Sequence, residues 1–406
     1  MFVHDGLGEG MTVYLDHAAT SPLRPEARDA WLAATETLGN ASSIHAAGQA
    51  ARRLLEESRE RLAVVLGCDP IEIVFTSGGT ESVNLAIKGL WWGRMPGTDT
   101  IVLPDGEHHA TLDTVGWLVA RDGAEMRPVA LDPHGAIPAD AFNEALGGAA
   151  LATAVVANNE VGTVNDAVGL ALAAAGAGTP LHLDAVSALG HIPVSFSEWR
   201  ADAAGPAGLV ALSVSAHKVG GPAGVGALVV ARQASLAPLV HGGGQQRGLR
   251  AGTQDVAGAA AFATAAQLTS AELSAETARL ARLRDRLVHG ILATVDGSEL
   301  LGSVENRLPG NAHILFPGAS GETLLFLLDQ SGIAVSTGSA CQAGVAEPSH
   351  VVLALGRTDA EARQVLRFTL GRTSTEADVE AVLAALPAAV ERARAAASGA
   401  RPGARS

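Results

Sequence analysis

The sequence contains very little lysine. Only two lysines, Lys88 and Lys218, occur among its 28 Lys and Arg residues. Arginine keeps its proton in proteins, whereas a desolvated lysine can become a neutral amine and form a Schiff base. Lys218 lies in the stretch SAHKVGG, between the apolar run Leu209–Val214 and a glycine pair. It is therefore either a surface lysine or a reactive amine where a buried strand ends.

Cysteine and net positive charge are also scarce. Two cysteines, Cys68 and Cys341, provide neither a disulfide framework nor a zinc cluster, and they favour a reducing compartment. The formal net charge of −14 argues against a nucleic-acid backbone as the main ligand. It leaves open a partner protein that modifies RNA.

Long apolar runs are absent. No stretch approaches the roughly 20 residues needed to span a bilayer. The first residues include Asp5 and Glu9 and show no cationic segment before an apolar run, so we expect no signal peptide. These absences predict a cytoplasmic protein without a membrane segment.

What the chain does contain is an alternation of strands and helices. With 406 residues it is long enough for two domains at ~150 residues each. Between residues 71 and 230, short apolar runs alternate with helical periodicity, which predicts an α/β fold with a mostly parallel sheet covered on both faces. Strands are expected at Ile71–Phe75, Thr100–Leu103, Ala124–Ala130, Thr153–Ala157, Leu181–Asp184, Leu209–Val214 and Gly226–Val230.

The pattern changes near Gly258. A long helix is expected over Ala259–Ala293, followed by shorter strands and by helices that include Asp359–Val365 and Thr375–Ala396. We therefore predict an N-terminal arm (1–24), a large domain (25–258), a smaller α+β domain (259–396) and a frayed tail (397–406).

Several of the predicted strands end in polar residues. After the strand near Phe75, the turn TSGGT contains Gly79 and Thr80 and is either a phosphate cradle at a helix N-terminus or a plain turn. His108 follows the next strand and is either a ring-stacking proton carrier or part of a solvated loop. Asn159 follows another strand and either binds a polar group or shapes a turn.

Asp184 closes the strand Leu181–Asp184. A buried acid needs a partner, such as a protonated ring nitrogen, unless it caps a helix. Ser215 and His217 precede Lys218. Taken together, the strand ends suit one cofactor with a phosphate, a flat ring, a ring nitrogen and an aldehyde. That combination predicts pyridoxal 5′-phosphate.

Two downstream residues are further candidates. Cys341 lies among small polar residues in STGSACQAG, which favours a nucleophile on a flexible loop over a passive thiol, whereas Cys68 is expected to be structural. Arg367 lies between apolar residues in LRFTLG and suits either capture of a substrate carboxylate or an internal salt bridge.

The chain resembles cysteine desulfurases of the class V aminotransferase group (NifS/IscS-like). The likeness extends from YLDHAAT at Tyr14–Thr20 to RFTLG at Arg367–Gly371 and includes GNASSIH, VFTSGGTE, NNEVG, HGGG and GSAC. The spacing from Cys341 to Glu347–Ser349 resembles the longer catalytic loop of the IscS-like subgroup. The resemblance implies fold type I of the PLP-dependent transferases, with a large domain and a smaller C-terminal domain.

The resemblance also implies residue roles. Lys218 would hold the cofactor as an internal aldimine and move the substrate's α-proton, and Cys341 would take the sulfur of L-cysteine as a persulfide and leave L-alanine. Asp184 would pair with the pyridine nitrogen, and His108 would stack on the ring and transfer protons. The resemblance further implies that the cofactor's phosphate is held by Gly79, Thr80, Ser215 and His217 and, from the other subunit of a homodimer, by Thr253. Asn159 and Arg367 would bind the substrate carboxylate, and Asn159 would also contact the ring-oxygen side of the cofactor.

The sequence departs from the family at Ser187, where a glutamine usually contacts the cofactor's ring oxygen. Further departures are Ala216, Gln246 and Ala251, and none removes a group that the core mechanism requires. A C–S or selenocysteine lyase, in which Cys341 is dispensable, and a non-catalytic sulfur relay are the alternatives. The sulfur acceptor is expected to be a protein, either an iron–sulfur scaffold or a tRNA-thiolating enzyme.

Overall fold

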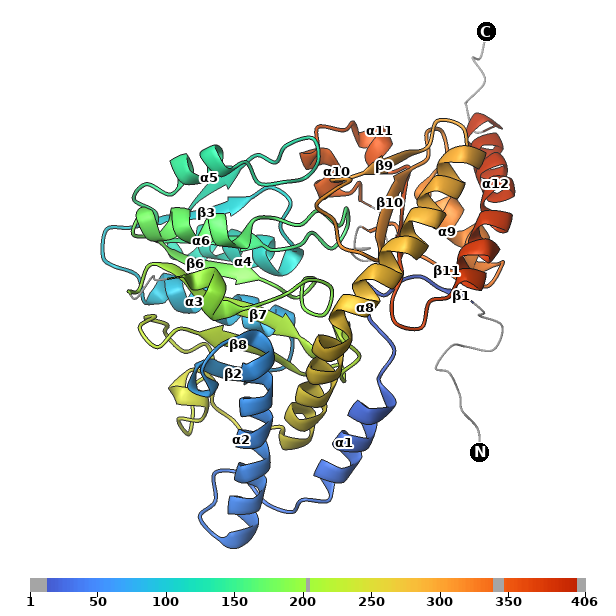
Figure 1. Cartoon of the computed structure of the whole chain (residues 1–406). Coiled ribbons are helices and arrows are strands. Elements are labelled where there is room, and N and C mark those ends of the chain that lie inside the picture. Colours follow the sequence, from blue (N-terminus) through green and yellow to red (C-terminus); the bar gives the residue numbers. More distant parts are fainter. Residues whose placement is uncertain (1–12, 202–204, 339–346, 400–406) are drawn as a thin grey trace.

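The computed structural model describes residues 13–201, 205–338 and 347–399. Its largest sheet has seven strands in the order β2-β8-β7-β6-β5-β3-β4 (Figure 1). All neighbours pair in parallel except β8, which is antiparallel to both β2 and β7. The mostly parallel mixed sheet is thereby confirmed. The strands are β2 (Ile73–Thr76), β3 (Thr100–Pro104), β4 (Glu125–Val129), β5 (Leu151–Val155), β6 (Pro180–Asp184), β7 (Gly208–Ser215) and β8 (Gly226–Val230).

Burial explains why these segments form strands. Every residue of β2, β3, β5, β7 and β8 is buried, as expected when helices cover both faces of a parallel sheet. Only β4, at the edge, is largely exposed. The helices between the strands are α3 (Gly79–Trp92), α4 (His109–Asp122), α5 (Ala139–Ala145), α6 (Ala167–Gly176) and α7 (Phe196–Arg200).

A second core lies at the other end of the molecule. It is built on a three-stranded antiparallel sheet of order β12-β10-β9, from β9 (Glu299–Leu301), β10 (Asn311–Leu315) and β12 (Val365–Thr369). The N-terminal strand β1 (Val13–Tyr14) pairs in parallel with β11 (Ile333–Ala334) beside this core. The helices here are α9 (Gly321–Asp329), α10 (His350–Ala354), α11 (Asp359–Ala362) and α12 (Glu376–Gly399).

The long helix α8 (Val256–Thr294) joins the two cores (Figure 1). Its first half contributes Phe262 and neighbouring alanines to the core of the large sheet, and its second half contributes Leu287 and Ile291 to the second core. Helices α1 (Pro25–Thr35) and α2 (Ala46–Leu66) pack against it. The predicted boundary at 258 therefore falls inside the first turn of a helix that both cores share.

Two segments differ from the sequence-based expectation. The helix predicted at Asp359–Val365 ends at Ala362, because Val365 begins the buried strand β12 and pairs with Leu315 of β10. A β-branched and aromatic run favours a strand once a partner strand lies beside it. Helix α12 continues to Gly399, three residues into the predicted tail, and residues 400–406 lie outside the described part.

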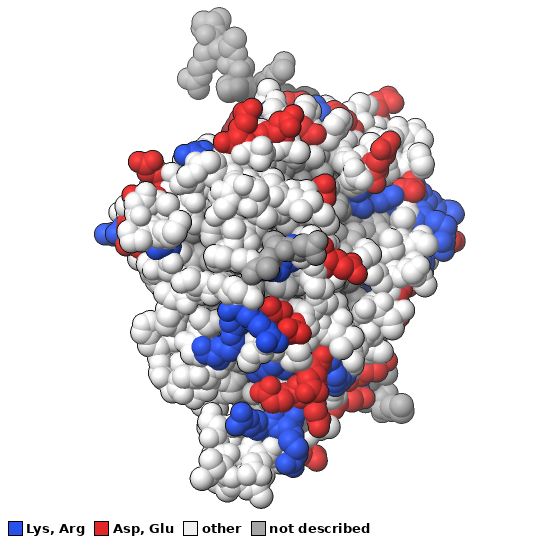
Figure 2. Space-filling model, turned by 60° about the vertical axis from the view of Figure 1, so that its left-hand side comes forward, with Lys and Arg blue, Asp and Glu red and all other residues white. Residues whose placement is uncertain are grey.

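Surface properties agree with the composition. Across the face in Figure 2, basic and acidic side chains are interspersed and form no continuous basic surface. Among the described residues, no helix combines the length and the apolar character needed to cross a membrane.

Candidate active site

The parallel strands bring several predicted residues to one edge of the large sheet. The carboxyl ends of β3, β5, β6 and β7 meet there, and the polar residues that follow them converge. Lys218 ends the short 3₁₀ helix η2 (Ala216–Lys218) directly after β7, and Asp184 is the last residue of the adjacent β6.

A cradle forms where β2 passes into α3. Gly78 has φ 152° and ψ −176°, a conformation essentially restricted to glycine. At Gly79, a Cβ would lie 2.7 Å from Val186 Cγ2 and 3.7 Å from Ser215 Cβ, so the backbone of the helix start lies close to β7. The N–H groups of Gly79 and Thr80 belong to the first turn and have no helical acceptor. Ser215 Oγ is buried and has no hydrogen-bond partner among the described residues. The cradle thus offers unpaired donors to an anion.

Asp184 is a buried acid with one hydrogen bond in the described structure. Its Oδ1 accepts from Val186 N at 2.9 Å. Burial raises the pKa of Asp184 to about 6, while this hydrogen bond and the positive charge of Lys218 keep the pKa from rising further. Beneath it, the buried His182 bridges Thr153 on β5 and Ser213 on β7 at 2.9 and 2.7 Å. The acid therefore ends a strand that polar contacts hold in register.

Lys218 is held by the N-terminal arm. Its Nζ donates hydrogen bonds to the carbonyl oxygens of Ala18 and, at 3.0 Å, Ala19. Burial lowers the pKa of Lys218 to about 8, helped by the charge of Arg367 and opposed by Asp16 and Asp184. A lysine with this pKa supplies a neutral amine near physiological pH, which Schiff-base chemistry requires.

His108 and Glu107 lie between β3 and α4. His108 caps α4, and its Nδ1 accepts from Ala110 N at 3.0 Å, so the neutral ring carries its proton on Nε2. His108 keeps exposed surface, but nearby protein atoms still desolvate its side chain. This desolvation, with the charge of Lys218, lowers the pKa of His108 to about 4. Burial, with the charge of Asp184, raises the pKa of Glu107 to about 8, although a hydrogen bond from Val155 N lowers it. Glu107 is therefore a neutral acid beside Asp184 near pH 7.

Arg367 approaches from the second core. It lies on β12, and its side chain is only 5% exposed. Its Nη1 donates to the carbonyl oxygen of Asn159 at 2.9 Å, and its Nη2 forms an ion pair with Asp16 at 2.8 Å. The structure thus brings Asn159 and Arg367 together, through the backbone of Asn159 and not its side chain.

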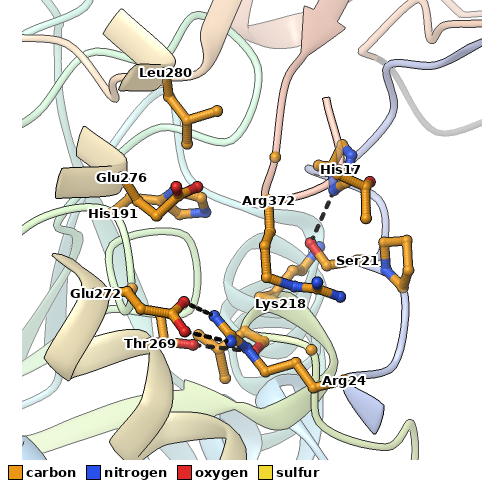
Figure 3. Close-up of a pocket in the computed structure, with 16 residues that line it drawn as sticks. His17, Ser21, Arg24, His191, Lys218, Thr269, Glu272, Glu276, Leu280 and Arg372 are labelled. Carbon is orange, nitrogen blue, oxygen red and sulfur yellow. Dashed lines mark hydrogen bonds and ion pairs between the residues drawn. The ribbon is translucent and has the colours of Figure 1, made fainter. Parts of the chain in front are cut away.

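Lys218 also borders two hollows. One is a cavity lined by Ser187, His17, His191, Asn159 and Lys218. The other is a pocket between the arm and α8 that includes the Arg24–Glu272 ion pair (Figure 3). Lys218 lines both, whereas the cradle residues Gly79, Thr80 and Ser215 line neither.

Two predicted residues are not placed at this edge. Cys341 lies outside the described residues. Thr253 is exposed in the loop before α8 and lines neither hollow beside Lys218. His217 reaches the arm, where its Nδ1 lies 3.2 Å from Thr20 Oγ1.

The sequence-based candidates did not include Asp16, Glu107, His17 or His191. The only local signal for Glu107 was its place beside His108 after a strand. Asp16 and His17 belong to the YLDHAAT motif, but the motif assigned them no role, because they reach the site through pairing of the arm with strands more than 300 residues away.

Comparison with known proteins gives a consistent result. Residues 13–382 match the family model described as aminotransferase class-V. An IscS-like cysteine desulfurase of Mycobacterium tuberculosis is 50% identical over 391 residues, which cover 95% of this chain and 98% of that protein. A cysteine desulfurase IscS of Methanosarcina thermophila is 37% identical and covers 97% of each chain.

Solved structures are similar as well. A NifS-like protein superposes with a TM-score of 0.86 at 32% identity, covering 94% of this chain and 100% of its own. DndA from Streptomyces lividans has a TM-score of 0.73 at 32% identity, covering 88% of this chain and 99% of its own.

Proposed function

This chain belongs to the class V aminotransferase family, and we propose that it is a cysteine desulfurase that converts L-cysteine to L-alanine and carries the sulfur on Cys341 as a persulfide. The observation that carries the proposal is the meeting of Lys218, Asp184 and the Gly79–Ser215 cradle at one sheet edge. The relatives named as cysteine desulfurases support the reaction type along nearly the whole chain.

The residues present fit pyridoxal 5′-phosphate. The unpaired, buried Ser215 Oγ beside the start of α3 suits a phosphate, together with Gly79, Thr80 and His217. Asp184 suits a protonated ring nitrogen, His108 suits the ring face, and Lys218 suits the aldehyde. When bound, this cofactor supplies an electron sink for the bonds at the substrate's α-carbon.

The protein's own groups then have separate tasks. Asp184 is ionised at neutral pH because its pKa is about 6, and the neutral Glu107 adds no second negative charge beside it. Lys218 removes and returns a proton at carbon. Arg367, with Asn159, receives the substrate carboxylate. His108 remains neutral above its pKa of about 4 and exchanges a proton through Nε2.

The sulfur step assigned to Cys341 balances without an external oxidant. The Cys341 thiolate attacks the sulfur of the bound cysteine, forming an S–S bond as the C–S bond breaks. The electron pair of the C–S bond stays with carbon, which takes a proton and leaves as L-alanine. A thiol reductant or an acceptor protein then removes the sulfur from Cys341.

Ser187 is the main departure from the family. Because serine is shorter than glutamine and lines the cavity beside Lys218, we propose that a water bridges Ser187 Oγ and the ring oxygen of the cofactor. Ser187→Gln should fill part of the cavity and shift the absorption maximum of the bound cofactor.

Partners are part of the proposal. We propose a cytoplasmic homodimer in which the exposed Thr253 of one copy reaches the phosphate site of the other, and transfer of sulfur to an acceptor protein, either an iron–sulfur scaffold or a tRNA-thiolating enzyme. Sedimentation of the purified protein tests the dimer. Capture of proteins that receive labelled sulfur from L-cysteine tests the acceptor.

The activity is tested with purified protein loaded with pyridoxal phosphate, L-cysteine and dithiothreitol. We expect alanine and sulfide in equal amounts, loss of sulfide in Cys341→Ser, and retention in Cys68→Ser. Cys68 is the matched control because burial and the nearby Glu72 and Asp69 raise its pKa to about 12, which suppresses the thiolate. Pyruvate and ammonia in place of alanine would identify a lyase and contradict the proposal.

A further inference from the structure

The N-terminal arm supplies contacts to both cationic groups of the site. The Ala18 and Ala19 carbonyls accept from Lys218 Nζ, and Asp16 pairs with Arg367. Four residues of the arm, Asp16–Ala19, therefore span the distance between the amine that does the carbon chemistry and the arginine that receives the substrate carboxylate.

The arm is fixed on both sides of Asp16. Leu15 N donates to Ala334 O at 2.9 Å, and His17 N donates to Thr369 O at 3.2 Å. The hydroxyl of Tyr14 donates to the Asp16 carbonyl oxygen at 3.0 Å. Thr369 lies on β12, two residues after Arg367, so Asp16 and Arg367 are held on neighbouring backbone segments. Asp16 is thus placed by backbone pairing and does not depend on the ion pair for its position.

Farther along, the arm is tied to the strand end that carries Lys218. Ser21 N donates to His217 O at 3.0 Å, and Arg24 N donates to Gly220 O at 2.8 Å. Figure 3 shows Ser21, Arg24 and Lys218 around one pocket, with Arg24 anchored on Glu272 of α8. One continuous segment therefore links β12, Lys218 and α8.

The guanidinium of Arg367 is only partly satisfied. Nη1 donates to Asn159 O and Nη2 to Asp16, whereas Nε is buried and has no partner among the described residues. A buried unpaired donor is costly, so it favours a ligand that accepts from it. A buried arginine also requires a counter-charge, which Asp16 provides before substrate arrives.

We propose that Asp16 is a positioning residue for substrate recognition: it holds the plane of the Arg367 guanidinium so that Nε, the donor left without a partner among the described residues, receives the carboxylate of an α-amino acid. The inference rests on the proposed function only in naming that ligand. Asp16 acts through Arg367, and its loss reduces the preference of the site for ligands that have a carboxylate.

The test compares two amines that differ in a carboxylate. L-Alanine and ethylamine are titrated into the cofactor-loaded protein, and binding is followed by calorimetry and by the visible spectrum. In the unmodified protein L-alanine binds more tightly. In Asp16→Asn we expect the preference for L-alanine to fall about tenfold to a hundredfold, as for loss of a charge-assisted hydrogen bond. The affinity for ethylamine should change less than about threefold, within the range of a near-neutral substitution.

A double-mutant cycle separates positioning from general structure. Arg367→Gln should abolish the preference, and Asp16→Asn added to Arg367→Gln should reduce it no further. Asp29→Asn is the matched control, because Asp29 is exposed on α1 and pairs only with the exposed Arg28 in the described structure. Melting temperatures of all variants report on folding.

Three results would overturn the proposal: an unchanged preference in Asp16→Asn, an equal loss of affinity for both amines, or a full additional loss in the double variant. If Asp16→Asn does not fold, Asp16→Glu is used, since it keeps the charge. It should retain the preference within about tenfold, and in that case loss of the preference in folded Asp16→Glu takes the place of the first contrary result. Failure of sulfur release in the unmodified protein would refute the desulfurase assignment and leave this ligand comparison intact.

Discussion

Lys88 and Lys218 are residues of the same type in two different regions of the molecule. Lys88 lies on α3, where its ammonium rests 4.8 Å from the ring centroid of Trp117, an indole that is 46% exposed. Such a cation–π contact on a helix surface leaves the side chain partly hydrated. Lys218 follows the buried strand β7 and is surrounded by Asp184, Arg367 and the arm carbonyls.

The difference shows what makes a lysine reactive in this fold. A helix face offers packing and solvent, whereas the end of a central strand removes water and adds charges from three other segments. Reactivity at Lys218 is therefore a property of the sheet edge and of the arm that covers it.

Removing the amine of Lys218 and that of Lys88 in separate variants should give the largest difference in activity between the two regions. Lys218→Ala should abolish the visible absorption of bound pyridoxal phosphate and lower sulfide release by about a thousandfold or more. Lys88→Ala should leave both within about twofold, since the lost contact is worth about 0.5–1 kcal/mol at an exposed site. Sulfide assays and absorption spectra measure the effects. Comparable losses in the two variants would remove the basis of the comparison.

Removal of the negative charge of Asp184 should have the second-largest effect on activity. Asp184→Asn keeps the size of the side chain but cannot balance a protonated ring nitrogen, so activity should fall by about a hundredfold or more. In the unmodified protein, cofactor affinity should fall as the pH drops through about 6, because Asp184 is then protonated. Fluorescence titrations with the cofactor at several pH values check this, and an affinity independent of pH near 6 in the unmodified protein would be the contrary result.

The amine of Lys218 should react at lower pH than an ordinary lysine. Burial and the charge of Arg367 lower its pKa from 10.5 to about 8. Attachment of pyridoxal phosphate, trapped by borohydride after a short fixed time, should therefore rise as the pH passes through about 8 and then level off. Peptide mapping distinguishes Lys218 from Lys88. A half-maximal rate above about pH 10 would mean that Lys218 is as solvated as a surface lysine.

The smallest effect is on stability. Because burial disfavours the protonated form of Lys218, the folded state bears a cost at neutral pH, and Lys218→Met should raise the melting temperature of the cofactor-free protein by roughly 1–4 °C. The cost is present below the folded pKa of about 8 and disappears as the pH rises towards the ordinary value of 10.5. The gain should shrink over that interval. Lys88→Met should give no comparable gain.

Local sequence patterns singled out one side of the candidate site. His108 and Lys218 come after short apolar strands and Asp184 closes one, and the parallel arrangement places such strand ends together. Each of these three residues can be singled out from its neighbours in the sequence. The fold adds the information that the strand ends lie at one edge of the sheet. The polar bridge made by His182 lies inside a strand, where the periodicity of apolar residues does not distinguish it from a core position.

The other side of the site depends on long-range pairing. Asp16 and Arg367 are 351 residues apart, and the arm reaches β12 through backbone and side-chain bonds between segments that are distant in the sequence. Strand β12 was missed for the same reason, since Val365 also fits the end of a helix until β10 lies beside it. The resemblance to cysteine desulfurases named Arg367 but gave no role to Asp16.

The central claim is that the amine at the sheet edge and the thiol of Cys341 divide the reaction between them. Intact-protein and peptide mass spectrometry after brief exposure of the cofactor-loaded protein to L-cysteine, without reductant, tests it directly. We predict one added sulfur atom on the peptide containing Cys341, an equal amount of L-alanine, and neither in Lys218→Ala. Sulfur on Cys68, or alanine formed with no sulfur on Cys341, would contradict the account.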